Sequence, residues 1–166
     1  MKKLKYILLG GLFALGMTAC DDYLDVNTDP DNPTAETATP EVRLTWIQNF
    51  FEYAWSSASM RSSQITGVLT QTSTTSANGL LAKWNPGQGS ATTPYQNWYI
   101  GAAVNIEPLI TAAEAVGANH YAGAAHTIKA MGFMMMLDLF GEIPYHQAFT
   151  GKYDPDYDNG KELFNC

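Results

Sequence analysis

The apolar segment between Asn119 and Phe140 constrains the fold more strongly than any other part of the chain. Gly141 follows it at the position where helices commonly end in a left-handed residue, and Pro144 prevents the helix from continuing. The apolar side chains that leave this segment almost no polar face are Ile128, Met131, Phe133, Met134, Met135, Met136, Leu137 and Leu139. Because a helix that is apolar all round must be covered by other elements, we predict that it is the central buried helix of a helical domain.

An earlier helix is expected to begin at Pro40, because Thr39 can cap it and proline is favoured at the first helical position. Its apolar residues form two stripes, one of Leu44, Ile47, Phe51 and Trp55 and one of Trp46, Phe50 and Tyr53. Two apolar faces predict burial, so we expect Trp46 and Trp55 to lie in the core. Residues 56–79 are rich in Ser, Thr and Gln and predict that this helix fades into a loop.

A third helical segment is expected from Thr93 to Val116. Pro108 must kink or divide it, because proline lacks the amide donor and its ring clashes with the preceding turn. Upstream of this segment, Pro86-Gly87 fits the centre of a type II turn.

The succession of helices with short connections predicts an all-α fold built from helix pairs. The spacing of Tyr121, Ala130 and Met134 shows a weak similarity to tetratricopeptide repeats. By itself this spacing decides nothing about the repeat type.

The first nineteen residues indicate an export signal. Three lysines precede an apolar stretch, residues 7–15, which is too short to span a bilayer as a helix. Met17-Thr18-Ala19-Cys20 then resembles the lipobox of bacterial lipoproteins, in which the cysteine is acylated. We predict that residues 1–19 are a lipoprotein signal peptide and that Cys20 carries the lipid anchor. The alternative is an ordinary signal peptide followed by a chance cysteine.

The segment after Cys20 is acidic and contains several prolines, so residues 20–38 are expected to form an extended tether ahead of a helical domain at residues 39–166. The whole chain has 9 Lys and Arg against 16 Asp and Glu, which gives a net charge of -7. Nucleic acid is therefore excluded as an expected partner, because binding to it depends on Lys and Arg displacing counterions. With Cys20 acylated, Cys166 has no partner for an intrachain disulfide.

Two stretches resemble the SusD-like (SusD/RagB) family of nutrient-binding outer-membrane lipoproteins. One runs from Cys20 to Thr34, and the other from Leu137 to Tyr145 is similar to the family signature Asp-x-Phe-Gly-(Asp/Glu)-(Ile/Val)-Pro-(Tyr/Phe). The resemblance implies tetratricopeptide-type helix pairs and a lipid-anchored protein on the outer membrane, facing the cell exterior. It also implies that oligosaccharide or another nutrient is bound and delivered to a SusC-like TonB-dependent transporter.

Members of that family are longer than this chain. Asn159-Gly160-Lys161-Glu162 resembles a capping box that opens another helix near Cys166. We therefore interpret residues 39–166 as the N-terminal part of a SusD-like domain, truncated at its C-terminus.

No catalytic motif, phosphate-binding loop or dinucleotide fingerprint is recognisable, so we expect no enzymatic activity and no cofactor. The spacing of His120, His126 and His146 does not place two rings on one helical face, and the Asp-rich stretches from Asp25 and Asp154 depart from the calcium-loop pattern. No metal is expected. A lipid-anchored hydrolase whose catalytic part lies beyond residue 166 remains the alternative function.

Three aromatic residues are candidates for ligand contact: Trp84 in a loop, and Tyr95 and Trp98 early in the next helix. Sugar rings stack on exposed aromatic faces, although Trp84 could instead close a small satellite core. Asp138 sits unfavourably near a helix C-terminus, and we expect it to accept amide protons from the turn that contains Gly141 and Pro144. A ligand-binding role for Asp138 is the alternative.

Overall fold

The structure is a computed structural model, and it describes residues 38–70, residue 81 and residues 83–164. Residues Thr39–Cys166 belong to one compact unit. Cys20, the predicted signal peptide and nearly all of the predicted tether lie outside the described residues.

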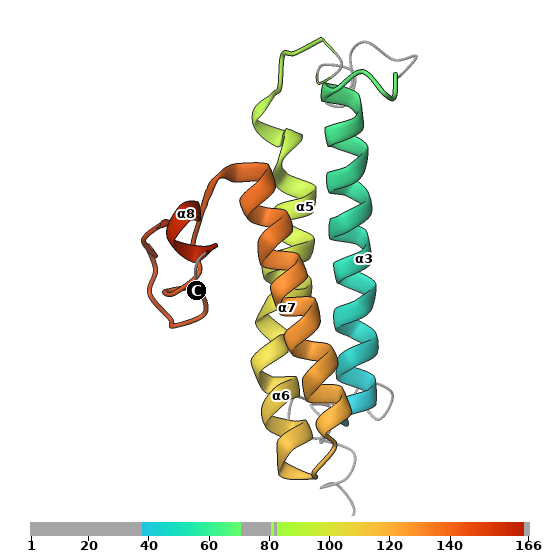
Figure 1. Ribbon diagram of the computed structural model, residues 1–166, viewed down its shortest axis with the longest axis vertical. Helices are drawn as coiled ribbons and strands as arrows, with labels where there is room; N and C mark the ends of the chain where they lie inside the picture. Colours follow the sequence, from blue (N-terminus) through green and yellow to red (C-terminus); the bar gives the residue numbers. More distant parts are fainter. Residues whose placement is uncertain (1–37, 71–80, 82, 165–166) are drawn as a thin grey trace, which may run out of the picture. The chain divides into compact units, whose positions relative to one another are not determined.

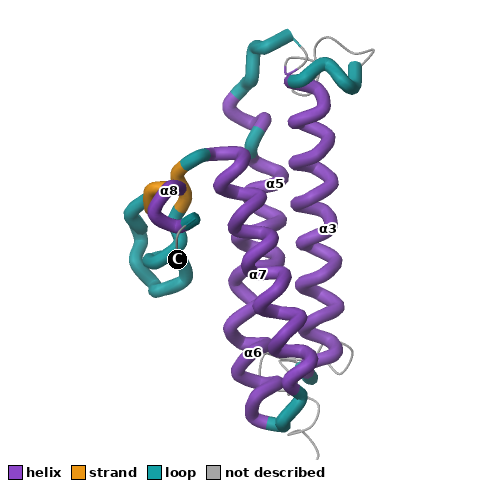
Figure 2. The backbone as a smooth tube through the Cα atoms, in the orientation of Figure 1, coloured by secondary structure: helices purple, strands orange, loops and turns teal. Residues whose placement is uncertain are grey.

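Three helical segments of the unit lie side by side (Figure 1 and Figure 2). They are α3 (Pro40–Ile65), a composite segment from Thr92 to Ala115, and α7 (Asn119–Phe140). The composite segment and α7 are joined by a short turn and pack against each other, as a helix pair does. The all-α class predicted from the sequence is confirmed, and α7 has the predicted bounds. No helix in the described part of the chain is long and apolar enough to cross a membrane.

Helix α3 begins as predicted, with Pro40 in its first turn, and Thr39 holds the N-cap position without a side-chain hydrogen bond to the helix. It ends at Ile65, within residues 56–79, over which it was predicted to fade into a loop. Its buried positions are Ile47, Ala54, Ala58 and Gln64. The prediction that both faces are buried is wrong. Trp46, Tyr53 and Trp55 are 54%, 58% and 44% exposed. Only one face of α3 meets its neighbours, and small alanines on that face let them approach closely.

The composite segment changes its helical pitch three times. Helix α5 (Thr92–Gln96) is followed by the π-helical turn η2 (Asn97–Ala102), the 3-10 turn η3 (Ala103–Asn105) and helix α6 (Ile106–Ala115). Pro108 lies in the first turn of α6, where its missing amide costs least. Of the two predicted outcomes, a kink or a division, the segment shows a division, and its breaks lie upstream of Pro108.

The loop before the composite segment departs from its predicted turn. Gly87 has φ -81°, which does not fit the second central position of a type II turn, and it precedes the short 3-10 turn η1 (Gln88–Ser90). The left-handed residue is Trp84, with φ 55°, and its amide donates to the carbonyl of Leu81 at 3.0 Å. The turn therefore ends at Trp84.

The hydrophobic core fills the space between the three helical segments. Trp98 lies at its centre with 0% exposure, and its indole contacts Phe51 and Phe133 through ring centroids 6.1 and 5.2 Å apart. The ring lies directly over Gly132 on α7, where a Cβ atom would overlap it. Other fully buried large side chains are Ile47, Ile106, Leu109, Met136 and Ile143.

After α7 the chain forms a small extension, residues 141–164, which we call the hooked extension. Gly141 ends the helix with φ 78°, and its amide donates to the carbonyl of Leu137 at 2.8 Å. Strands β1 (Glu142–Ile143) and β2 (Asp158–Asn159) then pair in antiparallel fashion. Helix α8 (Gly160–Leu163) follows at once, and the Asn159 side chain caps it by accepting from the amide of Lys161. The predicted N-terminal cap of this helix is confirmed.

Candidate functional site

The Asp158 carboxylate holds the hooked extension together. Its Oδ2 accepts hydrogen bonds from the backbone amides of Tyr145 and His146, both at 2.8 Å, and its Oδ1 lies 2.9 Å from Nδ1 of His146. Partial burial acts to raise the pKa of Asp158, but the hydrogen bonds from the His146 ring and from the two amides outweigh it and leave the pKa below its usual value. We call this arrangement the Asp158 clamp.

A hollow of about 420 Å³ lies between α5, the end of α7, strand β1 and the residue that precedes β2. Its walls are Tyr95, Phe140, Glu142, Ile143 and Tyr157, and we call it the tyrosine hollow. Tyr95 meets Phe140 edge to face, with ring centroids 6.1 Å apart. Burial, together with the neighbouring Tyr157 phenol, raises the pKa of Tyr95, so its hydroxyl is a neutral hydrogen-bonding group near pH 7. Aromatic faces beside a carboxylate suit a ligand rich in hydroxyl groups.

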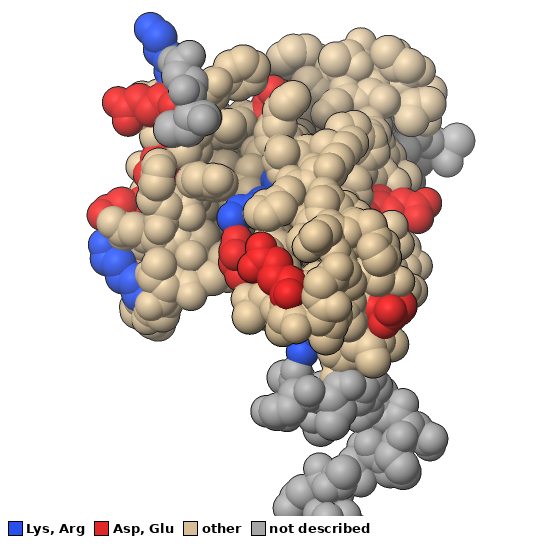
Figure 3. Space-filling view, turned by 60° about the horizontal axis from the view of Figure 1, so that its bottom comes forward, with Lys and Arg blue, Asp and Glu red and all other residues tan. Residues whose placement is uncertain are grey.

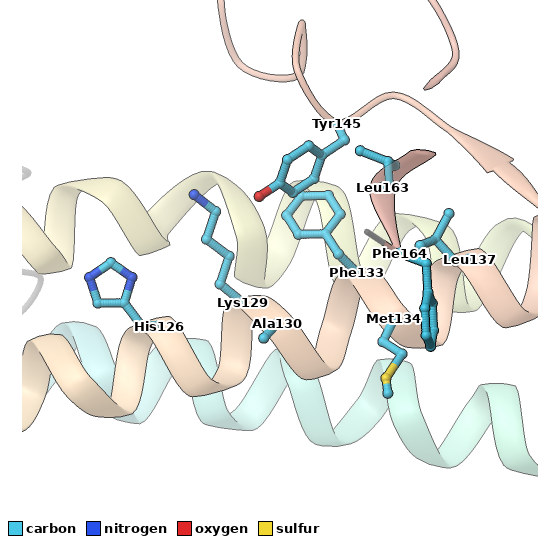
Figure 4. Close-up of a pocket in the computed structure, with 9 residues that line it drawn as sticks. All are labelled: His126, Lys129, Ala130, Phe133, Met134, Leu137, Tyr145, Leu163 and Phe164. Carbon is cyan, nitrogen blue, oxygen red and sulfur yellow. The ribbon is translucent and has the colours of Figure 1, made fainter. Parts of the chain in front are cut away.

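A second cavity, of about 450 Å³, runs along α7 beneath the hooked extension, and we call it the α7 groove (Figure 4). Its lining residues are His126, Lys129, Ala130, Phe133, Met134, Leu137, Tyr145, Leu163 and Phe164. Figure 4 shows Lys129 and His126 toward one end and Leu137, Leu163 and Phe164 toward the other. The Tyr145 ring meets Phe133 edge to face at 4.7 Å, and Lys129 pairs with Glu107 at 2.5 Å.

The Asp158 clamp lies next to both cavities in the sequence and in space. Tyr157 precedes Asp158 and lines the tyrosine hollow, whereas Tyr145 precedes His146 and lines the α7 groove. The hydroxyl of Tyr99 also fixes this region from the core, because it donates to the carbonyl of Pro144 at 3.0 Å. Burial raises the pKa of Tyr99, so this donor keeps its proton. The Asp158 clamp and the hydrogen bond from Tyr99 to Pro144 therefore stabilise the segment that borders both cavities.

The structure places the three residues predicted to contact a ligand in different environments. Trp84 is 76% exposed on its loop, and Tyr95 lines the tyrosine hollow. Trp98 presents no surface to a ligand, because it fills the core above Gly132. The structure thus corrects the prediction for Trp98, and it does not place Trp84 among the residues that line the tyrosine hollow.

The predicted role of Asp138 is also corrected. Asp138 is exposed on α7, and the amide protons of Tyr145 and His146 go to Asp158. The expected turn is present around Gly141 and Pro144, but a different carboxylate holds it. Sequence reasoning missed Asp158 because its partners lie twelve and thirteen residues upstream, beyond any local turn pattern.

Charged side chains are scattered over the face shown in Figure 3, and uncharged ones cover most of it. The Asp-rich loop that begins at Asp154 uses its acids internally. Asp156 accepts from Gln147 at 2.6 Å and from Lys152 at 3.1 Å, and these hydrogen bonds lower its pKa. Within the described ranges no group of three or more His, Cys, Asp or Glu side chains is placed to hold a metal ion.

Comparison with known proteins gives one family. The profile of the SusD-like family, described as starch-binding associating with outer membrane, matches residues 31–166. No curated protein and no solved structure matches the chain significantly. The match covers the whole compact unit, including both cavities and the Asp158 clamp.

Proposed function

The chain belongs to the SusD-like family, and we propose that it is a surface-exposed outer-membrane lipoprotein that delivers oligosaccharide or another nutrient to a SusC-like TonB-dependent transporter. Family membership implies starch or glycan binding in association with the outer membrane. The lipid anchor, the orientation toward the exterior and the transporter are the further parts of the proposal.

The anchor is proposed at Cys20, which follows the lipobox-like Met17-Thr18-Ala19. A triacylated cysteine has enough buried hydrocarbon for stable attachment, which a single chain does not provide. The acidic residues 21–38 would then extend the compact unit away from the lipid surface.

The proposed ligand contacts are Trp84 and the tyrosine hollow. The observation that carries this part is that Trp84 exposes 76% of its surface, while the tyrosine hollow is lined by three aromatic residues and by Glu142. Aromatic rings can cover the apolar C–H faces of a sugar, and the carboxylate and tyrosine hydroxyls can bind its hydroxyl groups. This is the chemistry of a binding site, and we propose no catalytic role for it.

Two assays on cells that express the full chain test the proposal. Affinity electrophoresis of the extracted protein in gels with and without soluble starch should show retardation by starch. Proteinase treatment of intact cells should remove the protein if it faces the exterior. Equal mobility in both gels would contradict glycan binding, and full protection from the proteinase would contradict surface exposure.

A further inference from the structure

The residues after the Asp-rich loop contribute one wall to each cavity. Tyr157 borders the tyrosine hollow, and Leu163 and Phe164 border the α7 groove. We call residues 157–164 the strap. Any shift of the strap relative to α7 must therefore change both cavities together.

Several contacts dock the strap, among them the packing of Leu163 against the hydrophobic core. The β1–β2 pairing sets Ile143 opposite Asp158. Gly160 lies so close to the carbonyl of Gly141 that a Cβ atom would overlap it. A further contact is the Asp158 clamp, in which a side chain of the strap binds two backbone amides. The strands are only two residues long, so their ladder alone gives a weak attachment.

We propose that Asp158 is a positioning residue for ligand binding, which holds Tyr157 in the tyrosine hollow and Leu163 and Phe164 in the α7 groove through its hydrogen bonds to Tyr145 and His146. It touches no ligand itself, since its oxygens are engaged by the two amides and the His146 ring. The ligand part of this inference rests on the proposed function, whereas the docking of the strap does not.

The chemistry of the clamp distinguishes two substitutions. Asp158→Ala removes all three hydrogen bonds. Asp158→Asn can keep them, because its carbonyl oxygen can accept from both amides while its NH₂ group donates to an unprotonated Nδ1 of His146. Asp158→Asn should therefore dock the strap better than Asp158→Ala does.

Amide hydrogen exchange on the full chain tests the docking, and titration with maltoheptaose tests its consequence. Asp158→Ala should speed exchange within the strap, at the amides of Lys161 and Phe164, by about tenfold or more, because an undocked strap opens more often and these amides do not bond to Asp158. It should weaken maltoheptaose binding by a similar factor. Asp158→Asn, which keeps the acceptor oxygen for both amides, should stay closer to the wild type than Asp158→Ala in exchange and in affinity. Asp156→Asn is the matched control in the same loop and should leave exchange and affinity within about twofold of the wild type.

The outcomes distinguish the docking role of Asp158 from the identity of the ligand. Unchanged exchange in Asp158→Ala, or an equal loss in Asp156→Asn, would overturn the positioning role. If the wild type binds no maltoheptaose, the proposed ligand is wrong, but the exchange data still decide whether Asp158 docks the strap. To show that Asp158 acts through Tyr157, the losses of affinity in Asp158→Ala and Tyr157→Ala should not add in the double variant, and full additivity would contradict this step.

Discussion

The indole of Trp98 occupies the space that a side chain at Gly132 would need. Trp98 comes from the π-helical turn η2 and Gly132 from the middle of α7, so this contact fixes how the two segments pack. The close approach is possible because glycine carries no Cβ. It explains why a tryptophan can be completely buried between helices.

We predict that Gly132→Ala destabilises the unit by about 1–3 kcal/mol, because the added methyl group overpacks the core against the Trp98 ring. Gly123→Ala, on the same helix but with nothing near its missing Cβ, is the control and should gain about 0.5–1 kcal/mol from helix propensity. Urea unfolding followed by tryptophan fluorescence measures both. Equal effects of the two substitutions would rule out the packing argument.

The contact between Trp98 and Gly132 also shows what the sequence could and could not predict. The bounds of α7 were predictable, because Gly141 and Pro144 mark its end within a few residues of chain. The burial of Trp98 was not, because the space for it comes from a glycine 34 residues later. Periodicity reports which residues share a helix face, but it does not report which face has a neighbour. For that reason the two apolar stripes of α3 predicted burial of Trp46 and Trp55, which the structure shows to be about half exposed.

The exposed apolar residues of α3 lead to a prediction about solution behaviour. Val42, Trp46, Tyr53 and Met60 are all more than 40% exposed and recur along one side of the helix. Exposed apolar surface of this extent favours association. Residues 20–166 should therefore self-associate with rising concentration in sedimentation experiments. A monomer with a sharp two-state thermal transition at high concentration would contradict this prediction.

The depressed pKa of Asp158 predicts how stability changes in acid. In the unfolded chain an aspartate titrates near 3.9, and in the folded chain the pKa of Asp158 is lower. The clamp therefore contributes its full stability above about pH 4 and loses it as the pH falls through the folded pKa. The difference in unfolding free energy between wild type and Asp158→Ala should shrink between pH 4.5 and pH 2.5. A difference that stays constant over this range would speak against a stabilising carboxylate.

Acylation of Cys20 is tested directly by metabolic labelling. Radiolabelled fatty acid should enter the wild-type protein and not Cys20→Ala, because the thiol is the acylated group. The substituted protein should also leave the membrane fraction. Equal labelling of both proteins would exclude Cys20 as the anchor.

The candidate site was predictable in part from the sequence, and the wrong predictions for it share one cause. Trp84 and Tyr95 were identifiable as aromatic residues near a loop, and both have surface available to a ligand or line a cavity. Closeness in sequence to the turn at Gly141 favoured Asp138 over Asp158. The structure shows that Asp158, in the strap, holds the turn. The strap lies next to the turn because the chain folds back and pairs β1 with β2.

The central claim, that this protein binds glycan through Trp84 and the tyrosine hollow, is tested most directly by isothermal titration of the full chain with maltoheptaose. The wild type should bind saturably. Trp84→Ala and Tyr95→Ala should each weaken binding by about 1–3 kcal/mol, the scale of one buried aromatic contact, and Trp84→Ala should barely change the melting temperature because its side chain is exposed. Trp55→Ala, another exposed tryptophan, should leave the affinity unchanged. Affinity that is the same in wild type, Trp84→Ala and Tyr95→Ala would contradict the assignment of the site.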